Sequence, residues 1–124
     1  MTKRVLDVGQ CSVDHAAIRR LIEGQFGAQM VQSQGIDDTL KRLADERFDL
    51  VLVNRKLDAD YSDGLNVIRA IKAEASLSCT PVMLVSNYPD AQEAAVAAGA
   101  VPGFGKAELD QPATREKLRP HLSS

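Results

Sequence analysis

The sequence has few cysteines, no surplus of basic residues and no long apolar run. Cys11 and Cys79 are the only two cysteines, and their spacing is not that of metal ligands. The formal net charge of −2 gives no indication of binding to nucleic acid or to a membrane surface. No apolar stretch approaches the roughly 18 residues of a transmembrane helix. We therefore expect reduced thiols in a cytoplasmic protein, with neither nucleic acid nor membrane as a partner.

The length of 124 residues, of which 44% are hydrophobic, predicts one globular domain over residues 1–124. No linker, repeat or low-complexity segment divides it. Short apolar runs predict strands, and segments with near-helical apolar spacing predict helices, with Ser12 as the N-cap of the first and Pro120 fraying the last. The expected strands cover residues 4–8, 28–33, 49–54, 80–87 and 101–106. The expected helices cover residues 12–26, 36–48, 64–75, 89–100 and 111–122.

Two strands, 49–54 and 80–87, are apolar without interruption, which is typical of strands buried on both faces. Strands that alternate with helices predict an α/β fold with a parallel sheet covered by helices on both sides. Right-handed crossovers make a doubly wound sheet the natural topology. In such a sheet, functional groups gather at the carboxyl ends of the strands. We therefore expect one pocket that contains the residues at these ends: Gly9, Gln10, Asn54, Ser86, Asn87 and Lys106.

Four segments carry a resemblance to a known family. They read "VLDVG", "FDLVLVN…DGLNVIRAIK", "TPVMLVSN" and "AAGAVPGFGKAEL". The sequence resembles the receiver domain of bacterial two-component response regulators, of the single-domain CheY type. The resemblance covers essentially the whole chain. It implies a flavodoxin-like sheet with strand order 2-1-3-4-5, five flanking helices and a role in signal transduction.

In receivers, a carboxylate at the end of the third strand is phosphorylated, and an acidic pair after the first strand holds Mg²⁺. A hydroxyl residue and a lysine contact the phosphoryl group. The resemblance places Ser86 and Lys106 at these last two positions. The phosphoacceptor position falls on Asn54, and the acidic pair falls on Gly9 and Gln10.

The amide at position 54 changes the expected chemistry. A neutral amide lacks the charge with which a carboxylate attacks phosphorus, and Mg²⁺ prefers carboxylate ligands. We therefore expect no metal, no cofactor, no enzymatic activity, and phosphotransfer that is absent or very slow. Our hypothesis is that the Asn54 carbonyl accepts a hydrogen bond from Lys106 while its NH₂ group donates to a backbone carbonyl.

The resemblance thus predicts a pseudo-receiver that acts by phosphorylation-independent protein–protein interaction. Its partner would be a histidine kinase, another signalling protein or a second copy of the chain. Receivers usually dock through their fourth helix, fifth strand and fifth helix. On this chain that surface is expected to include Ala94, Ala98, Phe104 and Leu118.

The alternative is a competent phosphoacceptor that uses another carboxylate: Asp7, Asp58 or Asp60. Asp7 precedes Gly9 by two residues and lies on the same strand face. It is either a residual acid of the pocket or a buried polar residue bonded to backbone or to a lysine.

The segment after Asn54 is acidic. Asp58, Asp60 and Ser62 alternate as at the start of an EF-hand calcium loop, but Asp63 stands where that loop requires glycine. We expect a solvated acidic turn that also caps the following helix.

Receivers change conformation through an aromatic residue on the fifth strand and have a proline after the lysine. The sequence departs from both features. The aromatic position of the fifth strand falls on Gly103 in an ungapped comparison, or on Phe104 after a one-residue slip. Ala107 follows Lys106 where receivers have proline. Because a cis bond before a non-proline residue costs about 2.5–4 kcal/mol, we expect a trans bond there.

Overall fold

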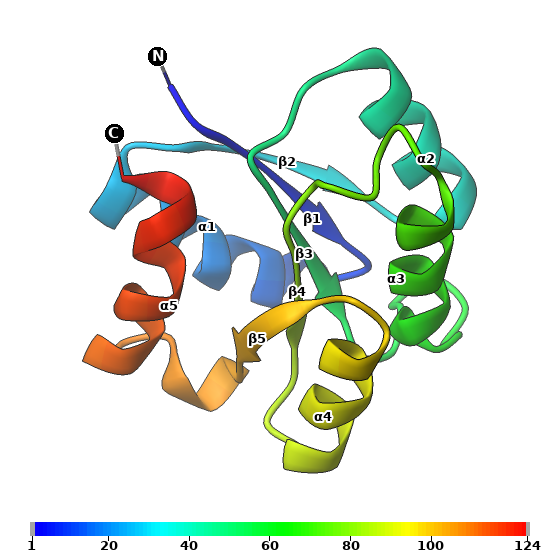
Figure 1. Cartoon of the computed structure of the whole chain (residues 1–124). Coiled ribbons are helices and arrows are strands. Elements are labelled where there is room, and N and C mark those ends of the chain that lie inside the picture. Colours follow the sequence, from blue (N-terminus) through cyan, green and yellow to red (C-terminus); the bar gives the residue numbers. More distant parts are fainter. Residues whose placement is uncertain (1, 124) are drawn as a thin grey trace.

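Five parallel strands form the centre of the molecule, and helices cover both of their faces (Figure 1). This computed structural model describes residues 2–123. The strands are β1 (Arg4–Val8), β2 (Gln29–Ser33), β3 (Leu50–Asn54), β4 (Val82–Val85) and β5 (Val101–Phe104). The helices are α1 (Ser12–Phe26), α2 (Ile36–Asp45), α3 (Gly64–Ala73), α4 (Pro89–Ala97) and α5 (Pro112–Leu122), and a short 3₁₀ helix η1 (Lys106–Glu108) follows β5.

The strand order is β2-β1-β3-β4-β5, which confirms the predicted doubly wound topology. Each crossover leads from the carboxyl end of one strand through a helix to the next parallel strand. The order reverses direction at β1, so the chain leaves β1 and β3 on opposite sides. The predicted functional edge therefore lies where β1, β3, β4 and β5 end.

Alternating side chains of the strands form two apolar cores, one on each side of the sheet. One core joins the sheet to α1 and α5, and contains Leu52 of β3 and Phe104 of β5. The other joins it to α2, α3 and α4, and contains Val51 and Val53 of β3. Because both faces of β3 and β4 are buried, these strands lack the polar alternation of a half-exposed sheet.

The predicted elements are all present, with ends that differ by a few residues. The N-cap of α1 is Cys11, whose Sγ accepts a hydrogen bond from the Asp14 amide at 3.5 Å, so the prediction of Ser12 is wrong by one position. Helix α5 continues through Pro120 to Leu122 instead of fraying. Within residues 2–123, no helix combines the length and apolarity needed to cross a bilayer.

Candidate functional site

A cleft of about 210 Å³ lies at the carboxyl ends of β3 and β4, beside the start of η1. It brings together Asn54, Ser86, Asn87 and Lys106, as predicted from the strand ends. Gly9 and Gln10 do not line it. The lining residues are Asn54, Arg55, Lys56, Val85, Ser86, Asn87, Tyr88 and Lys106.

The side-chain amide of Asn54 forms hydrogen bonds with two neighbouring backbone segments. Its Nδ2 donates to the backbone carbonyl of Lys56 at 2.6 Å and to that of Gly9 at 3.2 Å. Both amide hydrogens are thus directed at backbone oxygens, which confirms that part of the hypothesis. A carboxylate at this position could not make either bond, because it has no hydrogen to donate.

Lys106 does not bond to Asn54, which corrects the other part of the hypothesis. Its Nζ lies 2.7 Å from Oδ2 of Asp14, in the first turn of α1. This hydrogen bond with Lys106 holds the pKa of Asp14 below its usual value. A charge-assisted bond to a carboxylate is stronger than a bond to a neutral amide, which explains the choice of partner.

Asp14 is a residue of this site that none of the sequence motifs indicated, although its position gives a signal. The first turn of the helix that follows β1 lies at the carboxyl edge of the sheet, so an acidic residue there can reach the end of β5. Residues 2–123 contain no cis peptide bond, so the Lys106–Ala107 bond is trans as expected.

Asp7 is fully buried in the α1-facing side of the sheet. Its Oδ2 lies 2.7 Å from Nδ1 of His15, so its partner is a histidine instead of the predicted lysine or backbone group. Burial raises the pKa of Asp7 to about 6, although the hydrogen bond with His15 opposes this shift. Asp7 does not line the cleft.

The residues at the two positions of the acidic pair do not fit a magnesium ion. Gly9 has a left-handed φ of +76°, and a Cβ at this position would collide with the Leu57 side chain. Gln10 is 1% exposed, and its side-chain oxygen and nitrogen have no hydrogen-bond partner among residues 2–123. Neither position supplies a carboxylate, so the donor set that Mg²⁺ requires is missing from these two positions.

Side-chain hydrogen bonds fix the segment after β4 and join it to the segment after β5. Ser86 Oγ accepts from the Tyr88 amide at 3.1 Å, and Asn87 Oδ1 accepts from the Ala107 amide at 3.1 Å. The side chain of Ser86 is therefore placed at the cleft, as the sequence predicts, and Asn87 anchors η1 against β4.

In the acidic loop between β3 and α3, aspartate side chains accept hydrogen bonds from nearby residues of the loop and of the start of α3. Asp60 Oδ1 accepts from the amide and the hydroxyl of Ser62, at 2.9 and 2.6 Å. Asp63 caps α3 by accepting from the Leu65 amide at 3.0 Å, which confirms the predicted cap. Asp58 and Asp60 are exposed and do not line the cleft.

A glutamine stands beside the strand position where receivers have their aromatic residue. Gln92 of α4 donates through Nε2 to the carbonyls of Leu84 and Ser86, and its Oε1 accepts from the Gly103 amide. A Cβ on Gly103 would collide with the Leu84 carbonyl, so only glycine fits. Phe104 is buried in the opposite core, which favours the ungapped comparison.

The predicted docking surface needs correction. Phe104 and Leu118 are 1% and 0% exposed, because both pack into the core between the sheet and α5. Ala94 is exposed and Ala98 is half-buried. This face instead has a hollow of about 490 Å³ between α4, β5 and α5. The hollow is lined in part by Val96, Ala97 and Pro102.

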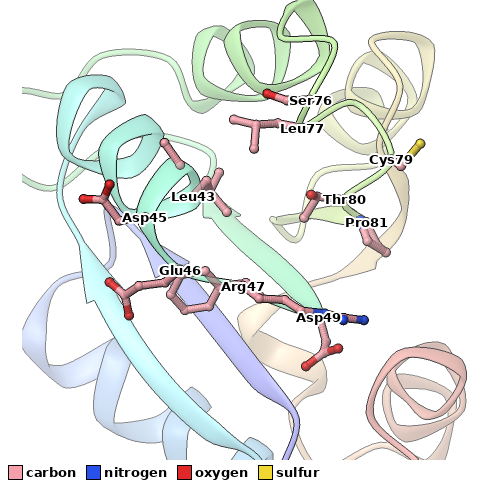
Figure 2. A pocket seen from close by; sticks show the side chains of 12 residues that line it. Leu43, Asp45, Glu46, Arg47, Asp49, Ser76, Leu77, Cys79, Thr80 and Pro81 are labelled. Carbon is pink, nitrogen blue, oxygen red and sulfur yellow. The ribbon is translucent and has the colours of Figure 1, made fainter.

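Another hollow, of about 570 Å³, lies at the opposite, amino-terminal edge of the strands. Figure 2 shows Leu43 and Asp45 of α2 across from Thr80 and Pro81, which precede β4. Two of its acidic groups already have partners. Glu46 pairs with Arg4 at 2.7 Å, and Asp49 accepts from the Arg4 amide at 2.9 Å. None of the predicted site residues lies there.

No protein-family model matches the sequence, and no curated protein does either. Solved structures match along nearly the whole chain. A response regulator from Thermotoga maritima has a TM-score of 0.78 and 26% identity, over 100% of both chains. A response regulator receiver protein from Pseudomonas putida has a TM-score of 0.78 and 18% identity, over 97% of this chain and 98% of that one. The phosphorylated cyanobacterial phytochrome response regulator RcpA has a TM-score of 0.77 and 18% identity, over 99% of this chain and 96% of that one.

These similarities show that the chain has the fold of a response regulator receiver domain. The cleft lies at the carboxyl edge of the sheet, where this class of domain has its phosphorylation site by the resemblance described above.

Proposed function

We propose that the chain is a pseudo-receiver: a signalling module that acts through protein–protein interaction and is not phosphorylated on an aspartate. The observation that carries this proposal is the position of Asn54. It ends β3 inside the cleft and directs both amide hydrogens to backbone carbonyls. The phosphoacceptor position is therefore filled by a neutral group with a structural role of its own.

The surroundings of Asn54 support the same conclusion. The ammonium group of Lys106 pairs with the Asp14 carboxylate, so its charge is balanced within the chain. Gln92 bridges β4 and β5 at the place of the aromatic switch residue. Both contacts favour a single conformation of this edge, which suits a constitutive binding module better than a switch.

The partner belongs to two-component signalling in this proposal: a histidine kinase, another signalling protein or a second copy of the chain. The setting is the bacterial cytoplasm, and the module has no catalytic activity of its own. The hollow between α4, β5 and α5 offers a partner the exposed side chain of Val96 at its edge.

A magnesium titration tests the proposal. Amide NMR shifts of the ¹⁵N-labelled chain are recorded as Mg²⁺ rises to about 10 mM, the range in which a competent carboxylate site responds. We expect no saturable shifts at residues 9–10 and 54–56. Saturable shifts there would show that the pocket holds a divalent cation after all and would overturn the proposal.

One observation favours a second candidate, a phosphoacceptor other than Asn54. Asp14 is the carboxylate that contacts Lys106, whereas Asp7 is buried and Asp58 and Asp60 lie outside the cleft. If the chain accepts a phosphoryl group, Asp14 is the first residue to test. Acetyl phosphate labelling that Asp14→Asn abolishes, and that Asp58→Asn and Asp60→Asn retain, would establish this candidate.

A further inference from the structure

Asp7 and His15 form a pair of side chains that has no part in the proposed function. Asp7 of β1 is fully buried, and its Oδ2 lies 2.7 Å from Nδ1 of His15 in α1. Among residues 2–123, this is the only side-chain hydrogen bond of His15. An ionised carboxylate only accepts hydrogen bonds, so the shared hydrogen belongs to Nδ1. In the neutral ring the lone pair is then on Nε2.

The His15 ring lies between this buried carboxylate and a hollow on the exposed face of α1. The hollow has a volume of about 640 Å³, and 16% of the His15 side chain is accessible to solvent. Because Nδ1 points to the fully buried Asp7, Nε2 is the ring nitrogen that a reagent in the hollow can reach. The other lining residues are Ala16, Arg19, Arg20, Glu23 and Gly24.

The two arginines give this hollow a positive charge. Arg19 follows His15 by four residues, so both lie on one face of the helix. Its Nε bonds to Glu23 at 3.0 Å, which leaves the other guanidinium hydrogens for a second partner. Within residues 2–123, Arg20 forms no salt bridge. Glu23 therefore offsets only one of the two charges, and the hollow favours an anionic group.

We propose that Nε2 of His15 accepts a phosphoryl group from donors that carry it on nitrogen, the phosphoramidate class. A carboxylate that holds a histidine in one tautomer, with the opposite nitrogen free, is an arrangement by which histidines act as bases and nucleophiles. His15 does not line the cleft at the strand ends. The proposal goes beyond the proposed function, which excludes phosphorylation on aspartate alone.

The transfer needs no further reactant. The lone pair of Nε2 forms a bond to phosphorus, and the P–N bond of the donor breaks. When phosphoramidate is the donor, its protonated nitrogen leaves as ammonia with the bonding electron pair. The ring keeps the hydrogen on Nδ1 and gains a positive charge, which the Asp7 carboxylate at 2.7 Å stabilises.

The tautomer of His15 is the first test, because it is measured on the unmodified protein. Burial raises the pKa of Asp7 to about 6, so its carboxyl is mostly ionised at pH 8. Long-range ¹H–¹⁵N spectra at this pH distinguish the two ring nitrogens. We expect the hydrogen on Nδ1. A hydrogen on Nε2 would overturn the proposal.

Incubation with potassium phosphoramidate tests the acceptor itself. Peptide mapping under alkaline conditions measures the labelling rate of each histidine, and ³¹P–¹⁵N coupling identifies the phosphorylated nitrogen. His121 is the second of the two histidines and pairs with no carboxylate within residues 2–123, so it is the internal reference. We expect His15 to be labelled at least about tenfold faster than His121. Equal rates, or no labelling of His15, would contradict the proposal.

Two variants separate the roles of the carboxylate and the arginines. Asp7→Asn should slow the labelling of His15 at least about tenfold and should move hydrogen from Nδ1 to Nε2. Arg20→Gln should slow it about threefold, the usual effect of losing one exposed charge contact. Arg69→Gln removes an exposed arginine of α3 and is the matched control. A rate that neither Asp7→Asn nor Arg20→Gln changes would show that the pair and the hollow do not act on His15.

These reactions contain neither acetyl phosphate nor Mg²⁺. A phosphoryl group on histidine survives alkali, whereas an acyl phosphate is hydrolysed by it. Failure to label His15 would therefore leave the proposed lack of aspartyl phosphorylation untouched. Conversely, an alkali-labile phosphoryl group on an aspartate would contradict the proposed function whether or not His15 is labelled.

Discussion

Lys106 Nζ lies 2.7 Å from Asp14 Oδ2, so an ion pair joins the end of β5 to the first turn of α1. These residues are 92 positions apart in the sequence. The pair gives the lysine an internal partner and leaves Asn54 to bond with the backbone. Both polar side chains thus have hydrogen-bond partners within the chain.

Asp14→Asn should destabilise the protein by about 0.5–1 kcal/mol at pH 7, because a pair that is about one-third exposed is strongly screened. The pKa of Asp14 is lowered in the folded state, so the stabilisation exists above the ordinary value of 3.8 and is lost as the pH falls below it. Urea unfolding at pH 7 and pH 3 measures both effects. Glu116→Gln is the control, since its pair with Arg119 is more exposed. An equal loss in both variants would contradict the assigned role of Asp14.

Asp7 should make the protein less stable as the pH rises from about 4 to 6. Burial raises the pKa of Asp7 to about 6 from 3.8, so the folded state binds its proton more tightly than the unfolded state does. The free energy of unfolding then falls over this range, by about 2 kcal/mol, and levels off above it. Asp7→Asn should remove this fall, which urea unfolding at several pH values measures.

The protonation of His121 also changes stability with pH and has to be controlled in the experiment on Asp7. Burial lowers the pKa of His121, so its contribution to stability grows as the pH rises through its ordinary value of 6.5, opposite in sign to that of Asp7. The comparison should therefore use His121→Gln with and without Asp7→Asn. Superimposable profiles of the two proteins between pH 4 and 6 would show that Asp7 does not titrate as described.

Asn54→Asp should destabilise the protein by about 1–3 kcal/mol, because it removes two hydrogen bonds and places a carboxylate against the carbonyl oxygens of Gly9 and Lys56. It should not restore phosphorylation, since positions 9 and 10 still lack carboxylates. Denaturant unfolding and acetyl phosphate labelling measure the two outcomes. Asn66→Asp, at an exposed position in α3, is the control and should change stability by less than about 0.5 kcal/mol. Robust Mg²⁺-dependent labelling of Asn54→Asp would refute the requirement for the acidic pair.

Gln92→Ala should destabilise the protein by about 2 kcal/mol, because it removes the three hydrogen bonds that hold α4 to β4 and β5. Hydrogen exchange should also quicken at the Gly103 amide. The neighbouring Glu93→Ala, at an exposed position, should have little effect on either quantity. Unchanged exchange at Gly103 in Gln92→Ala would show that the glutamine does not fix this edge.

The elements, the doubly wound sheet and the strand-end cleft could be predicted from the sequence, because apolar periodicity and topology determine them. The strand order was predicted only by the resemblance to receiver domains. The contacts of Lys106, Asp7 and Gln92 could not be predicted. Each joins side chains on different elements, and choosing among several nearby partners requires the positions of those elements in three dimensions. Phe104 and Leu118 were misplaced for a related reason. A docking surface assigned by element does not say which face of a strand or helix is buried.

The most direct test of the central claim is the intact mass of the protein after incubation with acetyl phosphate and Mg²⁺. If Asn54 has replaced the phosphoacceptor and no other carboxylate serves, the mass should remain that of the unmodified chain. A gain of one phosphoryl group that hydroxylamine removes would identify an acyl phosphate and contradict the account.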